Sequence, residues 1–224
     1  MSSFSSDLLG HEYEVNIGQY FSRGWGIFKE FAWAFVVYTL ALVIIGLVLG
    51  ALPAPLGNDP EQGTPGALSL IYQVIFYPVL MAGYYIVAFQ IARNRPKAFG
   101  DFFRSFNKFL PIFLVSLVGG LLTFLGCLAF LIPGLYLAVS YTFAQPLVID
   151  KNIGFWQALE TSRKVISKKW FSFLGLGLLL ILLNIGGLIA LGIGLLITAP
   201  LSFCIIAAAY EDIIGLNSVA EPTV

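Results

Sequence analysis

Three long stretches without lysine or arginine constrain the fold of this chain more than any other feature. They run from Glu30 to Gln90, from Phe109 to Asp150 and from Trp170 to the last residue, and each is long enough to cross a bilayer twice. Two crossings per stretch place every cation on one membrane face, which is normally the cytoplasmic face. All twelve basic residues lie in three short clusters that precede these stretches: Arg23 and Lys29; Arg93, Arg95, Lys97, Arg104 and Lys108; Lys151, Arg163, Lys164, Lys168 and Lys169.

The composition supports the same class of protein. Of 224 residues, 58% are hydrophobic and only 11% are charged, whereas soluble domains carry about 25% charged residues. A soluble fold would have too little polar surface to cover itself, but lipid favours an apolar exterior. The net charge is zero and the basic clusters are short, so nucleic acid is not expected as a partner.

The first charge-free stretch predicts two membrane spans. These are Phe31–Leu52 and Ala67–Ile91, and a polar loop at residues 57–66 separates them. Each reaches the roughly 20 residues that a helix needs to cross the hydrocarbon core. Pro78 lies inside the second span and should kink it.

The other two stretches each predict a pair of spans. Leu110–Ile149 and Phe171–Tyr210 are 40 residues long, and a helix of that length would be about 60 Å, twice a bilayer. We expect the first to break at Ile132-Pro133-Gly134 and the second near Leu191, in a glycine-rich segment. Pro200 falls early in the last span.

A segment with aromatic residues at helical spacing precedes each pair of spans. We expect amphipathic helices in the cytoplasmic interface, with their cations at anionic headgroups. Simple anchoring beside the membrane is favoured over regulatory lipid sensing. The aromatic and aliphatic positions are Phe21, Trp25, Phe28 and Phe31; Phe99, Phe103, Phe106 and Phe109; Phe155, Leu159, Ile166 and Trp170. The candidate headgroup residues are Arg23, Lys29, Arg104, Lys108, Arg163 and Lys164.

The predicted fold is an all-α polytopic membrane protein, with six transmembrane helices in three hairpins, each preceded by an amphipathic interfacial helix. Each unit starts from the same face, so the repeat is not the inverted kind found in transporters. The N-terminal residues do not resemble a signal peptide, and we expect insertion through the first span. The expected organisation is a polar N-terminal tail at 1–14, one integral membrane domain at 15–215 with repeats at about 15–92, 97–150 and 153–214, and a C-terminal tail at 216–224.

The sequence predicts no catalytic, cofactor-binding or metal-binding residues. The single histidine, His11, lies in the polar tail, and there is no phosphate-binding loop, HExxH or C-x-x-C motif. Cys127 and Cys204 lie in apolar runs and are expected to be buried free thiols rather than a disulfide or a metal pair. The expected spans contain no acid or base, which a proton relay or ion path normally requires.

Polar residues leave two questions open. Gln73 and Asn184 lie inside expected spans, where they either bond neighbouring helices or line a substrate path. Polar residues at the cytoplasmic ends of the spans either mark the water boundary or converge on one patch, if the three units pack around an axis. The members of this candidate patch are Gln90, Arg93, Gln145, Asp150, Glu211 and Asp212.

Several short motifs resemble a known group of proteins. They are Gly24-Trp25-Gly26-Ile27-Phe28, Gly83-Tyr84-Tyr85, Asp101 to Phe106, Ile132 to Tyr136, Ala158 to Ser162 and Lys169-Trp170. Over roughly Ile17 to Gly215, the chain resembles uncharacterised bacterial polytopic membrane proteins related to the membrane domain of some glycerophosphodiester phosphodiesterases. The resemblance implies a multi-pass protein of the bacterial cytoplasmic membrane. It implies no enzymatic activity, because the soluble phosphodiesterase domain and its metal ligands are not found in this sequence.

The expected function is therefore non-enzymatic: an accessory, scaffolding or lipid-interacting subunit of the inner membrane, with both termini cytoplasmic. Membrane lipids and other membrane-protein subunits are the expected partners. The alternative is a small transporter or channel for an uncharged or lipid-like substrate, which a polar groove containing Gln73 or Asn184 would favour. A lipid-modifying enzyme is the third class, and a buried cluster of Asp150 with a tyrosine or arginine would favour it.

Overall fold

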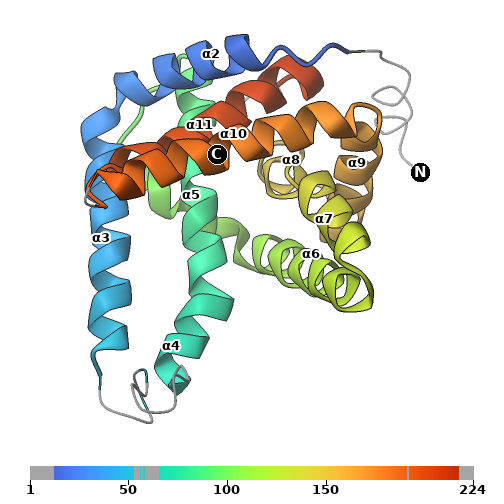
Figure 1. The fold of residues 1–224 in the computed structure, drawn as a ribbon. Coiled ribbons are helices and arrows are strands. Elements are labelled where there is room, and N and C mark those ends of the chain that lie inside the picture. The colour runs from blue at the N-terminus through green and yellow to red at the C-terminus, as the bar shows by residue number, and fades with distance from the viewer. Residues whose placement is uncertain (1–12, 53–55, 57, 59–65, 191, 217–224) are drawn as a thin grey trace.

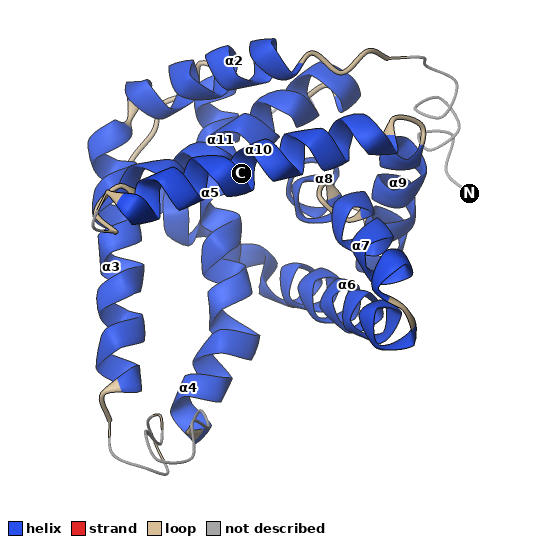
Figure 2. Cartoon of the chain, viewed as in Figure 1, coloured by secondary structure: helices blue, strands red, loops and turns tan. Residues whose placement is uncertain are grey.

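The computed structural model describes residues 13–52, 56, 58, 66–190 and 192–216, and these form helices and short loops without any strand (Figure 2). Six helical stretches among them are long and apolar enough to cross a membrane, which confirms the predicted helical class. His11, most of the two tails, most of the polar loop at 57–66 and Leu191 lie outside the described residues.

The first unit begins with α2 (Ile17–Glu30) and continues into α3 (Ala32–Gly50). The side chain of Asn16 caps α2 by accepting a hydrogen bond of 3.2 Å from the backbone N–H of Gln19. The buried face of α2 differs from the predicted aromatic stripe: Trp25 is exposed, whereas Tyr20, Gly24, Ile27 and Phe28 are buried. These four follow the i, i+4, i+7, i+8 pattern of one helix face.

The return helix of the first unit contains a widened turn. It runs without interruption through α4 (Ala67–Ile71), the π-helix η1 (Tyr72–Phe76) and α5 (Tyr77–Ala92). Pro78 has no N–H to donate and its ring would crowd the preceding turn of an α-helix. The chain accommodates it with bonds of π type, in which the Tyr77 N–H reaches the Tyr72 carbonyl. The helix irregularity expected at Pro78 is therefore a π-helix, which ends two residues before the proline.

The second unit starts with a 3₁₀-helix, η2 (Phe99–Lys108), where an amphipathic α-helix was expected. A 3₁₀-helix has three residues per turn, so every third residue shares a face. Phe102 and Ser105 are accordingly buried, while Phe103 and Phe106 of the predicted stripe are exposed.

The span pair of the second unit is α6 (Phe109–Ala129), followed by α7 (Leu131–Ser140) and α8 (Ala144–Lys151). The break lies at Phe130, which is extended, and not at Ile132-Pro133-Gly134 as predicted. Pro133 is the third residue of α7, where a backbone N–H has no acceptor within the helix, so proline is tolerated there. The second helix of this pair is itself interrupted between Ser140 and Ala144, where α7 ends and α8 begins.

The third unit consists of α9 (Phe155–Ser167), α10 (Trp170–Ile189) and α11 (Leu195–Ile214). The predicted break falls between α10 and α11, where Gly192 adopts a left-handed conformation (φ 75°) that favours glycine. Pro200 lies inside α11, close to its start.

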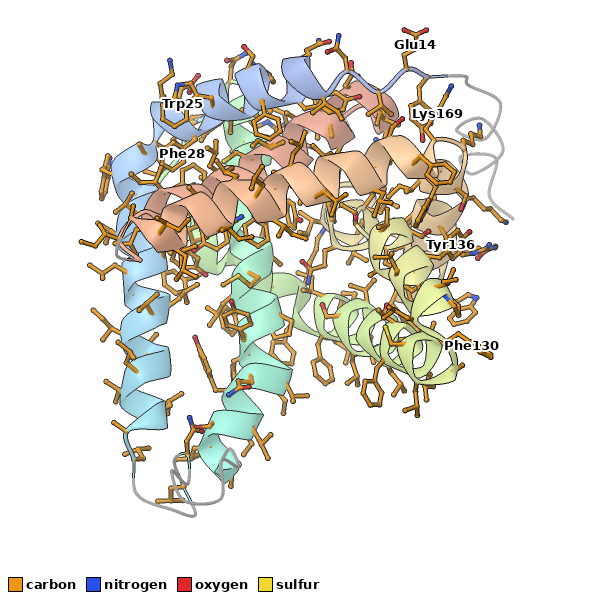
Figure 3. The ribbon with its side chains drawn as sticks, viewed as in Figure 1. Glu14, Trp25, Phe28, Phe130, Tyr136 and Lys169 are labelled. Carbon is orange, nitrogen blue, oxygen red and sulfur yellow. The ribbon has the colours of Figure 1, made fainter. Side chains whose placement is uncertain are left out.

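The three pairs of antiparallel helices point away from a shared core, with their far ends at the bottom, lower right and left of Figure 1. The core is rich in aromatic side chains, and the Tyr38 and Phe102 rings stack with centroids 4.3 Å apart. The outward faces are apolar and exposed, as at Leu47, Leu128 and Ile189. Figure 3 shows Phe130 at the connection of the second pair, and Trp25 and Lys169 toward the opposite side of the molecule, where α2 lies.

Candidate functional site

A buried polar cluster joins all three units at the ends of α5, α8 and α11. Arg93 follows α5, Asp150 and Lys151 end α8, and Tyr210 lies near the end of α11. Nη2 of Arg93 donates to Oδ1 of Asp150, and the phenol of Tyr210 donates to Oδ2 at 3.0 Å. Nζ of Lys151 lies 3.1 Å from the same Oδ2. The Asp150 side chain has no exposed surface, and we call these four residues the Asp150 cluster.

Asparagines follow two of the three helices that carry this cluster, α5 and α8. Asn94 (φ 53°) and Asn152 (φ 52°) are the only non-glycine residues with positive φ among those described. Asparagine tolerates this conformation better than most residues and commonly ends helices in it. At the end of α5, the Arg95 N–H reaches back to the carbonyl of Gln90 at 2.9 Å. The chain therefore turns sharply after Arg93 and after Lys151, which leaves both side chains at a helix end.

Two lysines bond backbone carbonyls near these ends. Nζ of Lys151 donates to the Gly215 carbonyl at 2.7 Å, just beyond α11. Nζ of Lys108 donates to the Ile149 carbonyl at 2.8 Å, in the last turn of α8. Cations are favourable at the C-terminal end of a helix because the last carbonyls are unpaired and carry partial negative charge. These bonds tie η2 and α11 to α8.

The carboxylates of α11 face α2. Arg23 makes two hydrogen bonds to Glu211, of 3.0 and 3.1 Å, and Tyr20 donates to Oδ2 of Asp212 at 3.0 Å. Burial raises the pKa of Tyr20, and the hydrogen bond to Asp212 raises it further, so the phenol stays protonated as a donor. A Cβ atom on Gly24 would lie 2.7 Å from the Ile205 backbone, so α2 crosses α11 too closely for any larger residue.

A pocket of about 520 Å³ lies beside the Asp150 cluster, between the end of α5, η2 and the last turn of α8. Its polar lining comprises four cations and two amides and contains no carboxylate: Gln90, Arg93, Arg95, Arg104, Asn107 and Lys108. We call it the basic pocket. Arg93 belongs both to this pocket and to the Asp150 cluster, so the buried carboxylate positions one of its cations.

Asp101 holds the side of the pocket formed by η2. Its Oδ2 accepts the backbone N–H of Ala98 at 2.8 Å, which fixes the first turn, and its Oδ1 lies 2.9 Å from Nε of Arg104. The Gln90 amide is best oriented with its nitrogen donating to Asp101 (3.0 Å) and its oxygen accepting from Arg104 (3.2 Å). A Cβ on Gly83 would be 2.3 Å from the Phe102 carbonyl oxygen, so only glycine lets η2 pack this closely on α5.

The six predicted headgroup cations have different environments. Arg104 and Lys108 line the basic pocket, and Arg23 pairs with Glu211. Arg163 and Lys164 both pair with Glu160 on α9, and the hydrogen bond from Arg163 lowers the pKa of that carboxyl. Lys29 is exposed, with Nζ 6.0 Å from the centre of the Trp25 ring.

The predicted polar patch is only partly assembled. Arg93 and Asp150 meet, and Gln90 lies beside them in the basic pocket. Glu211 and Asp212 instead face α2, as described above. Gln145 donates to Oγ of Ser116 at 2.7 Å and lines a different groove beside α6. The predicted patch does not include Tyr210, Lys151 or Arg95, although a buried cluster of Asp150 with a tyrosine or an arginine was one of the arrangements considered from the sequence.

The two polar side chains within the predicted spans lie on different helices, Gln73 in η1 and Asn184 in α10. Nδ2 of Asn184 donates to Oγ of Ser202 at 2.8 Å, which confirms a bond between α10 and α11. Gln73 lines a pocket of about 360 Å³ at the other end of the first pair, together with Tyr72, whose buried hydroxyl has no partner among the described residues. Both cysteines are free thiols; Cys204 is buried as predicted, but Cys127 is exposed on the apolar face of α6.

Over the part of the chain that the structure describes, no group of three or more His, Cys, Asp or Glu side chains could hold a metal ion. No family model, curated protein or solved structure matches this chain. The geometry of its own residues is therefore the basis for a functional proposal.

Proposed function

We propose that this chain is a non-enzymatic, multi-pass protein of the bacterial cytoplasmic membrane that acts as a lipid-interacting accessory subunit. The basic pocket is the observation that carries the proposal, because it gathers four cations without a carboxylate in its lining. Cations at the cytoplasmic end of membrane spans attract the anionic lipids of that leaflet.

In this proposal the three helix pairs are transmembrane hairpins, and both termini are cytoplasmic. The helices α2, η2 and α9 precede the hairpins and lie along the cytoplasmic interface. Exposed aromatic side chains on them support this placement: Trp25, Phe103 and Trp156. Aromatic rings are enriched at the level of the lipid headgroups.

The Asp150 cluster is the observation that favours an enzyme. A general acid or base must come within hydrogen-bond reach of the group that it protonates or deprotonates. Both oxygens of Asp150 are engaged by Arg93, Tyr210 and Lys151, and its side chain is fully buried. It lines none of the pockets described above. These contacts support a structural role for Asp150.

Transport is supported less well than lipid binding. A polar groove that contains Gln73 or Asn184 would favour transport, but Asn184 is engaged by Ser202 and Gln73 lines a pocket within the first helix pair. That pocket is lined by residues of the first pair alone, whereas the alternative needs a groove between the three units.

Lipid-dependent stability tests the proposal. The protein is reconstituted in nanodiscs of phosphatidylcholine alone or with added phosphatidylglycerol, and its unfolding temperature is measured at low and high salt. A ligand that binds only the folded state raises stability, so we expect a higher unfolding temperature with phosphatidylglycerol. Salt should reduce this difference because it screens exposed charges. Equal temperatures in the two lipids would contradict the proposal.

A further inference from the structure

We infer that the basic pocket is a defined site for the phosphate group of one anionic phospholipid. The inference rests on the proposed function and specifies where the lipid binds. A defined site of this kind differs from a general electrostatic attraction between the cationic end of the protein and the membrane surface.

The chemistry of the lining matches a phosphate. Arg93, Arg95 and Arg104 contribute planar guanidinium groups, which can donate two parallel hydrogen bonds to one phosphate. Lys108 adds an ammonium group and Asn107 an amide donor. The Nε atom of Arg93 is buried and has no acceptor among the described residues, and such an unpaired donor is unfavourable.

Arg93, Arg104 and Lys108 are held in place by other contacts. Asp150 binds Arg93, which also lies over the Phe89 ring at 5.9 Å. Asp101 binds Arg104, and the Ile149 carbonyl binds Lys108. Binding a ligand to side chains that are already ordered costs less conformational entropy. The pocket is therefore arranged for an anion before one arrives.

The surroundings of the pocket favour a lipid over a soluble phosphate. Phe103, Phe106 and Leu110 alternate with the pocket residues along η2 and the start of α6, and these residues are 46%, 38% and 61% exposed. An acyl chain could follow this apolar surface into the hydrocarbon core while the phosphate stays in the pocket. A soluble anion would gain nothing from it.

The test compares two variants that each lose two positive charges at the same end of the spans. The pocket variant combines Arg95→Gln with Arg104→Gln, and the control combines Lys168→Gln with Lys169→Gln, two exposed residues outside the pocket. Asp101 keeps its bond from the Ala98 N–H in the pocket variant, so η2 should still fold. Circular dichroism and the unfolding temperature check this for both variants.

Native mass spectrometry then measures binding of phosphatidylglycerol, phosphatidylcholine and inorganic phosphate to each protein. We expect the pocket variant to bind phosphatidylglycerol about tenfold more weakly than the parent, and the control to stay within about twofold. Equal weakening in both variants, or none in the pocket variant, would overturn the defined site but leave the proposed function standing. Displacement of phosphatidylglycerol by inorganic phosphate at similar concentration would show that the site takes a soluble anion. No preference of the parent for phosphatidylglycerol would contradict the proposed function itself.

Discussion

The phenol of Tyr210 donates a 3.0 Å hydrogen bond to the carboxylate of Asp150, and this contact joins the third helix pair to the second where both side chains are buried. The other oxygen of Asp150 binds Arg93, which belongs to the first unit. One carboxylate thus connects the three units at a single point. Outside the shared core the pairs diverge (Figure 1).

Removing this carboxylate should destabilise the whole domain. Asp150→Ala would leave the Arg93 guanidinium and the Lys151 ammonium without their anionic partner, and breaking a buried ion pair costs about 3–5 kcal/mol. Tyr210→Phe removes only one hydrogen bond to the carboxylate and should cost less, about 1.5–3 kcal/mol. Unfolding in detergent by denaturant measures both values. A cost for Asp150→Ala no larger than that for Tyr210→Phe would show that the cluster does not hold the units together.

Two glycines on α2 provide a matched pair of substitutions. Gly24→Ala would place a methyl group 2.7 Å from the Ile205 backbone, and such overpacking costs about 1–3 kcal/mol. Gly26→Ala meets no atom within 4 Å and should stabilise the helix by up to about 1 kcal/mol. Unfolding temperatures of the two variants should therefore shift in opposite directions. If both shift alike, α2 does not pack against α11 as described.

Ion-coupled transport should be absent. Among the described residues of the six candidate spans, carboxylates, amines and guanidinium groups lie only in η2, at the end of α8 and near the end of α11. A coupled pump needs a titrating group within the membrane. Asp150 is also fully engaged by its partners. Protein in liposomes should show no proton flux under an applied membrane potential, measured with a trapped pH-sensitive dye. A reproducible flux that Asp150→Asn abolishes would make transport the better account.

The helical spans were predictable because their signal is local. A run of about 20 apolar residues is sufficient to identify a span, and Ala32–Gly50 and Trp170–Ile189 follow the predicted limits within one or two residues. The position of the second break was not predictable in this way. Pro133 marks a turn in the sequence, but proline is equally suited to the first turn of a helix, which is where the structure places it.

The polar contacts depended on tertiary packing. Gln145 and Asp150 lie five residues apart along the chain, but the first reaches Ser116 in a groove of the second unit and the second reaches Arg93 and Tyr210. In the sequence, Tyr210 cannot be distinguished from other aromatic residues near the ends of apolar runs. Its role depends on the tertiary contact with Asp150 of α8. The 3₁₀ form of η2 was likewise not evident in the sequence, where Phe102 and Gly83, which are in close contact in the structure, lie 19 residues apart.

The central claim, that the cation-bearing ends of all six spans face the cytoplasm, is tested most directly by thiol labelling. Single cysteines replace Asn58, at the connection of the first pair, or Lys169, at the start of α10, in a background of Cys127→Ala and Cys204→Ala. Intact spheroplasts are treated with a membrane-impermeant maleimide, and lysed cells show that both positions react when accessible. We predict labelling at position 58 alone in intact cells. Labelling at position 169 in intact cells, or equal labelling at both positions, would contradict the claim.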